Sequence, residues 1–349
     1  MAVVDADCHV VESERTWSYM EGGDTRYRPV KVRSEQAMAP RLGDEAWVID
    51  GKLIRPGPVG LESTTQESRE MIAVDARLEH MDELGVDVQV LYPTIFLRPI
   101  TMDPKIEMAI TTSYNRWLGD IWSKGNGRLR WTVVLPFLSM AESLRELEWA
   151  KEHGACAVFI RGFEADRHLG DPYFFPLYEA AESMDLAICA HAGYSSFWLE
   201  QFYSRAGGLP VFKFPVVDAF LSLIHGKVPE QFPALRFGFI ETASQWVPWA
   251  IHSLGRADAS RAQAEGRSRG RVTDLMEKYR MYVACQTDDD IAYVLKYAGP
   301  GNLVIGSDYG HNDTSSELTA LRHLRDIEDL DDSVVDRILD ANPTALYGL

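Results

Sequence analysis

The chain has 349 residues, of which 46% are hydrophobic and 25% are charged, as is typical of a globular protein. Its formal net charge of −17 argues against nucleic acid or an anionic membrane as a partner. No apolar run reaches the roughly 18 residues that a membrane span needs, and the acidic N-terminus lacks the cationic segment of a targeting signal. We therefore expect a cytoplasmic protein in which the four widely spaced cysteines are free thiols.

Short apolar runs alternate with amphipathic stretches, which is the pattern of parallel strands connected by helices. The predicted strands are residues 3–10, 86–92, 131–135, 155–160, 186–191, 237–241, 281–285 and 303–306. The predicted helices are residues 75–84, 105–124, 141–153, 172–184 and 315–327. This alternation predicts the α/β class, as a (β/α)8 TIM barrel that forms one domain over residues 1–349.

Residues 13–74, after the first predicted strand, are rich in proline, glycine and charge. Within them, residues 47–54 form two short apolar runs around Asp50-Gly51, which predicts a hairpin. A long loop after a barrel strand lies at the active-site face, so we expect this insertion to cap the site. Residues 194–217 are also long and aromatic, and they are interpreted as a second lid or a subunit contact.

Metal-binding side chains stand at the ends of three predicted strands. His9 follows Asp7 in the first strand, His191 ends the fifth, and Asp308 follows the eighth. Strand alternation predicts that Asp5, Asp7 and His9 share one face. A single buried histidine is more often a hydrogen-bonded core residue than a ligand. Three such positions at the C-terminal ends of barrel strands, where barrels place their chemistry, instead predict a divalent metal site.

Further polar residues fall in the same neighbourhood. Glu241 ends the sixth strand, where a buried carboxylate needs a partner, and it is interpreted as a ligand, a bridge between two ions or a general base. His311 lies on the loop after the eighth strand. It is interpreted as a hydrogen-bond donor to a metal ligand, a catalytic acid or base, a ligand to a second ion, or an exposed loop residue. Arg161, just past the fourth strand, either pairs with a substrate carboxylate or has a structural role. Glu12 and Asp313 are weaker candidates.

A series of motifs in order along the chain supports this interpretation. They are Asp5-Ala6-Asp7-Cys8-His9 and residues 77–94, 114–118, 171–178, 233–241, 246–249, 306–311 and 342–349. Together they resemble the amidohydrolase-related family that includes aminocarboxymuconate-semialdehyde decarboxylase. The resemblance runs nearly end to end, and it implies a barrel with a divalent metal at the strand ends.

The resemblance also implies ligands at particular positions. Decarboxylases of this family typically use a His-x-His pair on strand one, a histidine on strand five and an aspartate on strand eight, with a further catalytic histidine on strand six. His9, His191 and Asp308 match this set, whereas Asp7 and Glu241 stand where histidines are expected. The chain thereby resembles a carboxylate-rich branch of the family. That branch includes a manganese/iron 2-aminoisobutyrate hydroxylase built from two related subunits and a di-iron thioacid-processing hydrolase.

Oxygen ligands shift metal preference from zinc toward manganese and iron. We therefore expect one or two manganese or iron ions, with zinc as a further option. The expected ligands are Asp7, His9, His191, Glu241, Asp308 and His311.

Three functions follow from these residues. The first is metal-assisted hydrolysis or non-oxidative decarboxylation of a small carboxylate, with Glu241 or His311 moving protons, Asp308 ligating metal or orienting water, and Arg161 holding substrate. The second is dioxygen activation at a dinuclear Mn/Fe or Fe/Fe centre, giving hydroxylation of a small amino or carboxylic acid. The third is a non-enzymatic barrel subunit that completes a partner. In each case a homo-oligomer, or a hetero-oligomer with a related barrel subunit, is expected.

Overall fold

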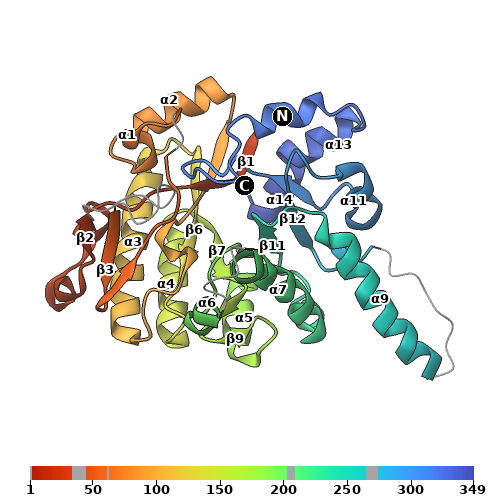
Figure 1. Cartoon of the computed structure of the whole chain (residues 1–349), viewed down its shortest axis with the longest axis horizontal. Helices are drawn as coiled ribbons and strands as arrows, with labels where there is room; N and C mark the ends of the chain where they lie inside the picture. Colours follow the sequence, from red (N-terminus) through yellow and green to blue (C-terminus); the bar gives the residue numbers. More distant parts are fainter. Residues whose placement is uncertain (1, 34–44, 61–62, 203–208, 265–273) are drawn as a thin grey trace.

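The computed structural model of the protein describes residues 2–33, 45–60, 63–202, 209–264 and 274–349. Within them, eight parallel strands form one sheet that curves into a barrel, ordered as they occur in the chain (Figure 1). These strands are β1 (Val4–His9), β5 (Val88–Tyr92), β6 (Leu129–Val134), β7 (Ala155–Arg161), β10 (Ala187–His191), β11 (Phe237–Ile240), β12 (Met281–Cys285) and β13 (Leu303–Ile305). The predicted (β/α)8 barrel is confirmed, and each predicted strand coincides with an observed one to within a few residues.

The barrel closes where the chain that follows β13 meets β1. The backbone N–H of Asp308 donates to the carbonyl of Asp7 (2.9 Å), and that of His9 donates to the carbonyl of Tyr309 (2.7 Å). This close approach requires Gly306, because a Cβ atom there would lie 2.2 Å from the Cβ atom of Asp7. The closure brings residues from opposite ends of the sequence together at the C-terminal edge of the barrel.

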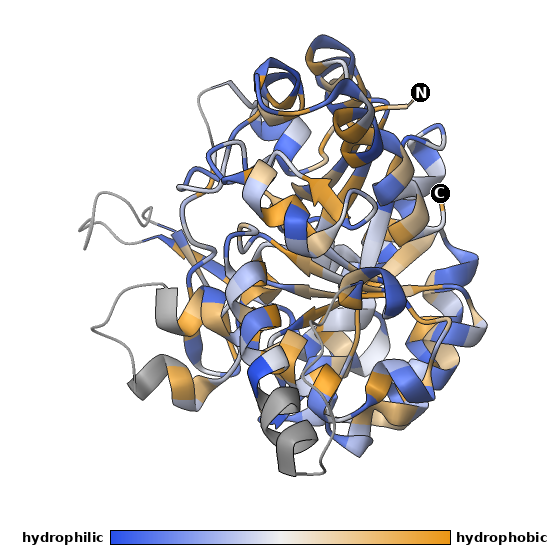
Figure 2. Ribbon diagram, turned by 90° about the vertical axis from the view of Figure 1, so that its right-hand side faces the viewer, coloured by the Kyte–Doolittle hydropathy of each residue, from blue (hydrophilic) through white to orange (hydrophobic). Residues whose placement is uncertain are grey.

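Helices surround the barrel (Figure 1). The longer ones are α2 (Val74–Leu84), α3 (Pro104–Lys124), α4 (Met140–Glu152), α5 (Phe175–Ser183), α7 (Phe214–His225), α9 (Trp246–Ala264) and α11 (Ile291–Ala298). Shorter ones are α1 (Gln66–Arg69), α6 (Phe197–Phe202), α8 (Val228–Gln231), α10 (Leu275–Lys278), α12 (Ala320–His323), α13 (Asp332–Asp336) and α14 (Asn342–Tyr347). Figure 2 shows hydrophobic residues concentrated along the central strands and hydrophilic residues on the outer helix faces. In the part of the chain that the structure describes, no helix is long and apolar enough to cross a membrane.

Local sequence signals set the ends of these helices. The carboxylate of Asp103 accepts a hydrogen bond from the N–H of Lys105, and Pro104 occupies the first turn of α3. α2 ends at Gly85, whose φ of 69° lies in the left-handed region that favours glycine. The two predicted helices over these residues are therefore confirmed.

The helix predicted over residues 315–327 is wrong in its first part. The structure has α12 from Ala320 onward, followed by a 3-10 turn over Leu324–Asp326. The residues before α12 contact the loop after β13 instead, because the hydroxyl of Ser316 donates to the carboxylate of Asp308 (2.6 Å). Side-chain hydrogen bonds of this kind compete with helix formation.

The insertion after β1 carries a small antiparallel sheet of β2 (Val30–Arg33), β3 (Glu45–Ile49) and β4 (Lys52–Ile54). The predicted hairpin is confirmed, since β3 and β4 pair around Asp50-Gly51, where both residues have positive φ. The insertion also reaches the C-terminal face of the barrel, where the N–H of Gly60 donates to the carbonyl of Gly310 (2.9 Å). It therefore lies against the loop that follows β13, where a cap is predicted.

The insertion also meets the second predicted lid, residues 194–217, of which residues 203–208 lie outside the described residues. The ammonium group of Lys52 lies 4.5 Å from the ring centroid of Phe197, at the start of α6. The hydroxyl of Thr101, after β5, donates to the carboxylate of Asp50 (2.9 Å). The hairpin turn is thereby held at the rim of the barrel.

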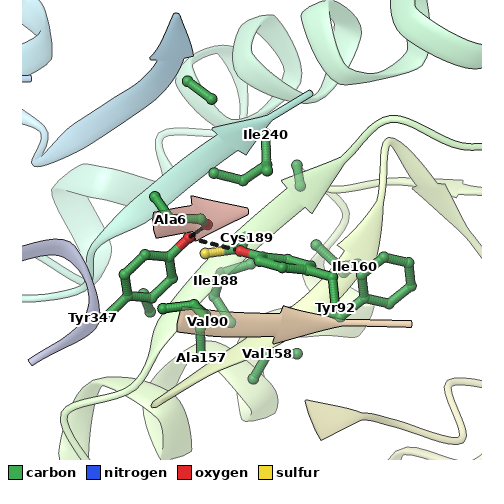
Figure 3. Close-up of a cluster of buried hydrophobic side chains, with 14 of the residues drawn as sticks. Ala6, Val90, Tyr92, Ala157, Val158, Ile160, Ile188, Cys189, Ile240 and Tyr347 are labelled. Carbon is green, nitrogen blue, oxygen red and sulfur yellow. Dashed lines mark hydrogen bonds between the residues drawn. The ribbon is translucent and has the colours of Figure 1, made fainter. Parts of the chain in front are cut away.

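Packed aromatic side chains lie beneath the C-terminal face (Figure 3). The hydroxyl of Tyr347, in α14, donates to the carbonyl of Ala6 (2.7 Å) and lies 2.8 Å from the hydroxyl of Tyr92. The Tyr92 ring contacts the ring of His191, with 4.9 Å between the two centroids. The Tyr347 side chain therefore reaches from the terminal helix into the barrel interior, where Tyr92 contacts His191.

We predict that Gly306→Ala destabilises the protein by about 2 kcal/mol, the usual cost of overpacking a closely packed site. The added methyl group would have to push β13 away from Asp7. Gly301→Ala is the matched control, because a Cβ atom there meets no heavy atom within 4 Å. Urea unfolding of both variants measures the effect, and equal stability of the two would contradict the prediction.

Candidate metal centre

The structure brings six of the predicted site residues into one buried cluster at the C-terminal end of the barrel. They come from β1, the end of β10, the residue after β11 and the loop after β13, and they are Asp7, His9, His191, Glu241, Asp308 and His311. Three overlapping groups, drawn from this cluster and the neighbouring Asp313, have ligand atoms close enough to share an ion: Asp7, His9 and His191; His9, Asp308 and His311; and Glu241, Asp308 and Asp313.

The first group is oriented by backbone carbonyl groups. The Nδ1 atom of His9 lies 2.8 Å from the carbonyl of Pro93, and the Nδ1 atom of His191 lies 2.8 Å from the carbonyl of Ala192. Each Nδ1 therefore carries the proton, which leaves the Nε2 lone pair available for a ligand. Both Nε2 atoms face Oδ1 of Asp7, at 3.4 Å from His9 and 3.2 Å from His191.

The second group joins β1 to the loop after β13. The ring of His311 stacks on that of His9 with 3.8 Å between centroids. Its Nδ1 atom lies 2.7 Å from Oδ1 of Asp308, and its Nε2 atom lies 3.1 Å from the hydroxyl of Thr94. That hydroxyl donates to the carbonyl of Val10 (2.7 Å), so it is free to accept a hydrogen from His311. Thr94 thereby holds His311 with Nδ1 toward Asp308.

Within the described part of the chain, neither carboxylate oxygen of the buried Glu241 has a hydrogen-bond partner. The Nδ1 atom of His191 lies 3.5 Å from Oε2, but that nitrogen already faces the carbonyl of Ala192. Both Glu241 and Asp308 adopt positive φ, of 60° and 52° respectively. Backbone strain at two buried carboxylates is typical of functional sites.

A divalent cation fits this arrangement. Among the described residues, buried atoms without a hydrogen-bond partner include Nε2 of His9 and both carboxylate oxygens of Glu241. Orphaned buried polar atoms are costly, and a bound ion would satisfy them together. The mixture of imidazole nitrogen and carboxylate oxygen suits manganese, iron or zinc.

Burial and neighbouring charges set the protonation of the cluster. Burial raises the pKa of Glu241 well above its ordinary value, and the charge of Asp308 adds to this effect. Burial and the nearby His311 lower the pKa of His9 to about 4. Burial opposes ionisation of Asp7, but His191 outweighs it and the pKa of Asp7 falls below its ordinary value. Metal binding would therefore displace a proton from Glu241.

His311 differs from His9 in its charge state. Burial opposes its protonation, but the carboxylate of Asp308 outweighs burial and raises the pKa of His311. The two stacked rings therefore have opposite tendencies, with His9 neutral and His311 inclined to hold a proton. A neutral ring suits a ligand, whereas a protonated ring beside a carboxylate suits proton transfer.

The predicted shared face of Asp5, Asp7 and His9 is wrong for Asp5. The pairing of β1 with β5 contains an extra residue between Asp5 and Cys8, which is a β-bulge. As a result the carboxylate of Asp5 accepts hydrogen bonds from the backbone and hydroxyl of Ser307, outside the cluster.

Arg161 lies beside the cluster and is already paired. Its guanidinium group donates to Glu164 and to the carbonyl of Phe96, and its backbone N–H donates to the same glutamate. Its predicted contact with a substrate carboxylate stays a prediction. Of the two weaker candidates, Glu12 is buried near Thr94, and Asp313 is exposed at the edge of the third ligand group.

Three residues near the cluster were not predicted. Thr94 lies just after β5, so the rule that chemistry sits at strand ends could have found it. Glu164 follows Arg161 by three residues, and an acid at that spacing is a weak signal of pairing. Glu107 lies within α3, and no sequence pattern distinguishes it from a surface helix residue.

This fold and this cluster agree with the comparison with known protein families. The chain matches the amidohydrolase family over residues 4–349, and it belongs to that family. The resemblance inferred from the motifs is confirmed at the family level, and the chain is an enzyme of the amidohydrolase superfamily.

Solved structures share the fold along the whole chain. An amidohydrolase from Mycobacterium avium subsp. paratuberculosis K-10 is 17% identical, with a TM-score of 0.80 and coverage of 100% of this chain and 98% of that chain. A 2,6-dihydroxybenzoate decarboxylase from Rhizobium is 15% identical, with a TM-score of 0.70 and coverage of 100% and 99%. A 5-carboxyvanillate decarboxylase from Novosphingobium aromaticivorans DSM 12444, complexed with manganese and 4-hydroxy-3-methoxy-5-nitrobenzoic acid, is 15% identical, with a TM-score of 0.70 and coverage of 100% and 96%.

We predict a pH-dependent contribution of Glu12 to stability. Burial raises the pKa of Glu12 to about 7, although its carboxylate accepts hydrogen bonds from the N–H groups of Thr94 and Ile95. The folded state keeps this proton after the unfolded chain releases it near pH 4.5, so the stabilisation is full below that pH and is lost toward pH 7.

The free energy of unfolding of the wild type, relative to Glu12→Gln, should therefore fall by up to about 1.4 kcal/mol per pH unit in this window. Urea unfolding of the metal-free proteins at several pH values measures this difference. A difference that does not change with pH would show that Glu12 is ionised throughout.

Proposed function

We propose that the protein is a metal-dependent hydrolase or non-oxidative decarboxylase that acts on a small carboxylic acid at the C-terminal face of the barrel. The observation that carries the proposal is the buried cluster of unpaired imidazole and carboxylate lone pairs at that face. Membership of the amidohydrolase family and the decarboxylases among the proteins of the same fold support it.

In this proposal Asp7, His9 and His191 would hold a divalent ion, and Glu241 and Asp308 would supply further ligands to it or to a second ion. When bound, a divalent cation supplies Lewis acidity and lowers the pKa of water. The hydrogen bonds to Pro93 and Ala192 keep the two imidazole groups in the tautomer that binds metal.

Proton transfer in this proposal belongs to Asp308 and His311. Oδ1 of Asp308 and Nδ1 of His311 are 2.7 Å apart, so a proton taken from water or delivered to the substrate can be shared between them. Thr94 holds the opposite side of the His311 ring and keeps it aligned. Glu241 serves as a second base if it does not bind metal. The insertion, which contacts the loop carrying His311, limits access of bulk water.

One observation favours a second candidate function. The three ligand groups overlap at His9 and Asp308, and the group around Glu241 consists of three carboxylates. This arrangement suits two oxygen-ligated ions, as in dioxygen activation at a Mn/Fe or Fe/Fe centre that hydroxylates a small amino or carboxylic acid. That function would require an electron donor, and a related barrel subunit is the expected partner.

The test is the metal content per chain after expression with added iron and manganese, followed by EPR before and after exposure to oxygen. A redox-silent ion, together with carbon dioxide release or hydrolysis in a screen of carboxylic acids, would support the first function. Two ions with an oxygen-dependent coupled signal would support the second. Failure to bind any divalent ion would contradict both.

We predict that His191→Ala loses metal while the barrel stays folded. Substituting a residue that only hydrogen-bonds to a metal ligand typically lowers metal affinity by roughly 10–100-fold. Removing a ligand itself should lower the affinity by more than that. His252→Ala is the control, because that ring is exposed, away from the cluster, and hydrogen-bonds to the hydroxyl of Tyr297. Metal analysis and circular dichroism of both variants measure the result, and full metal content in His191→Ala would refute the assigned cluster.

We also predict that Glu241→Gln reduces stabilisation by metal. The amide removes the negative charge that Glu241 would offer to a cation, and it removes the cost of keeping the buried carboxyl group protonated in the metal-free state. The variant should be at least as stable as the wild type without metal, but it should gain less stability when metal is added. Thermal unfolding with and without EDTA measures both quantities, with Glu148→Gln on exposed α4 as control. An unchanged response to metal, with activity lost, would assign Glu241 as a base.

A further inference from the structure

A polar pocket lies next to the candidate metal centre, at the same end of the barrel. Its walls come from the loops after β5, β6, β7 and β10 and from α3, and they include Phe96, Phe137, Phe159, Glu107, Arg161 and Glu164. The Phe159 ring also contacts the ring of His191, with 5.8 Å between centroids. Arg161 pairs in register with His191 across β7 and β10. The pocket therefore borders the metal centre along β7 and β10.

The pocket contains more carboxylates than cations. Among the described residues that line it, Arg161 is the only cation, whereas Glu107, Glu164 and Asp166 are acidic. Arg161 is 92% buried, since 8% of it is exposed, and its guanidinium group is already bonded to Glu164. The positive charge is therefore neutralised by Glu164, and the excess of carboxylates in the lining disfavours a second negative charge there.

Hydrogen-bonding capacity remains on two of these side chains. The Nε atom of Arg161 is buried, and no described residue forms a hydrogen bond with it. Glu107 is 9% exposed, and its Oε2 atom accepts from the backbone N–H of Leu138, which leaves Oε1 for another donor. Burial raises the pKa of Glu107 to about 8, so a proton or a cationic group at this carboxylate is favoured near neutral pH.

We infer that this pocket is a specificity subsite in which Glu107 accepts a hydrogen bond from an amine or hydroxyl group on the substrate, and which excludes a second carboxylate. The inference rests on the proposed function, because the carboxylate of the same substrate is taken to bind at the metal centre. The aromatic walls would contact the apolar carbon chain between the two ends. In this arrangement Arg161 positions Glu164 and does not clamp a substrate carboxylate.

The rim of the pocket agrees with this assignment. The hydroxyl of Ser196 donates to the carboxylate of Asp166 (2.6 Å), which places another acceptor at the opening. The nearby ammonium group of Lys52, over the Phe197 ring, is paired with Asp50 at 3.4 Å. This lysine is therefore also engaged within the protein.

The test compares metal-loaded protein with matched series of aminoalkanoates, hydroxyalkanoates, alkanedioates and unsubstituted alkanoates, with backbones from butanoate to hexanoate. Calorimetric titration measures each affinity. We expect the amino and hydroxy acids of the best length to bind about tenfold more tightly than the dioate, because one hydrogen bond to a charged group is gained. Tighter binding of the dioate, or equal binding of all four classes, would overturn the inference.

Glu107→Gln isolates the residue. The amide can still accept a hydrogen bond, so the aminoalkanoate should lose about tenfold in affinity while the hydroxyalkanoate changes little. Glu148→Gln, on the exposed face of α4, is the matched control. An unchanged preference for the aminoalkanoate in Glu107→Gln would overturn the role of Glu107, and the wild-type ranking tests the pocket even if this variant does not fold.

The failure of this inference can be separated from failure of the proposed function. If no divalent ion binds and no carboxylate binds, the proposed function fails. If the ion and simple alkanoates bind but the distal group makes no difference, the metal centre stands and only the subsite is refuted.

Discussion

The closure of the barrel between β1 and the chain after β13 is the contact on which the rest of the site depends. Two backbone hydrogen bonds at this seam place Asp7 and His9 beside Asp308. Gly306 makes the approach sterically feasible, since any side chain there would collide with Asp7. Because the seam is buried, the polar side chains gathered there lose their contacts with water. A bound cation would replace those contacts for several side chains at once.

The same seam organises the surroundings of the cluster. The loop after β13 carries His311, contacts the insertion near Gly60, and binds Ser316 through Asp308. On the opposite side, the Phe159 ring joins His191 to the acidic pocket. The site thus has a metal-binding end and a hydrogen-bonding end, held by neighbouring strands.

The sequence predicted the barrel and the members of the cluster for a simple reason. Parallel strands place their C-terminal ends on one face, so His9, His191 and Asp308 had to converge once their strands were identified. The same reasoning failed for Asp5, because a bulge in β1 cannot be read from alternation alone. It also failed for the start of the helix at residues 315–327, where the hydroxyl of Ser316 binds Asp308.

By itself, the sequence determined the strand order, the hairpin at Asp50-Gly51 and the identity of the polar residues at the strand ends, since these follow from local periodicity and turn chemistry. Only the tertiary structure decided which buried polar atoms lack a hydrogen-bond partner and which are already bonded within the protein. The guanidinium group of Arg161 is neutralised by Glu164, whereas Glu107, on a distant helix, contributes to the same pocket. Burial and pairing depend on contacts between segments far apart in the chain, and no local pattern encodes them.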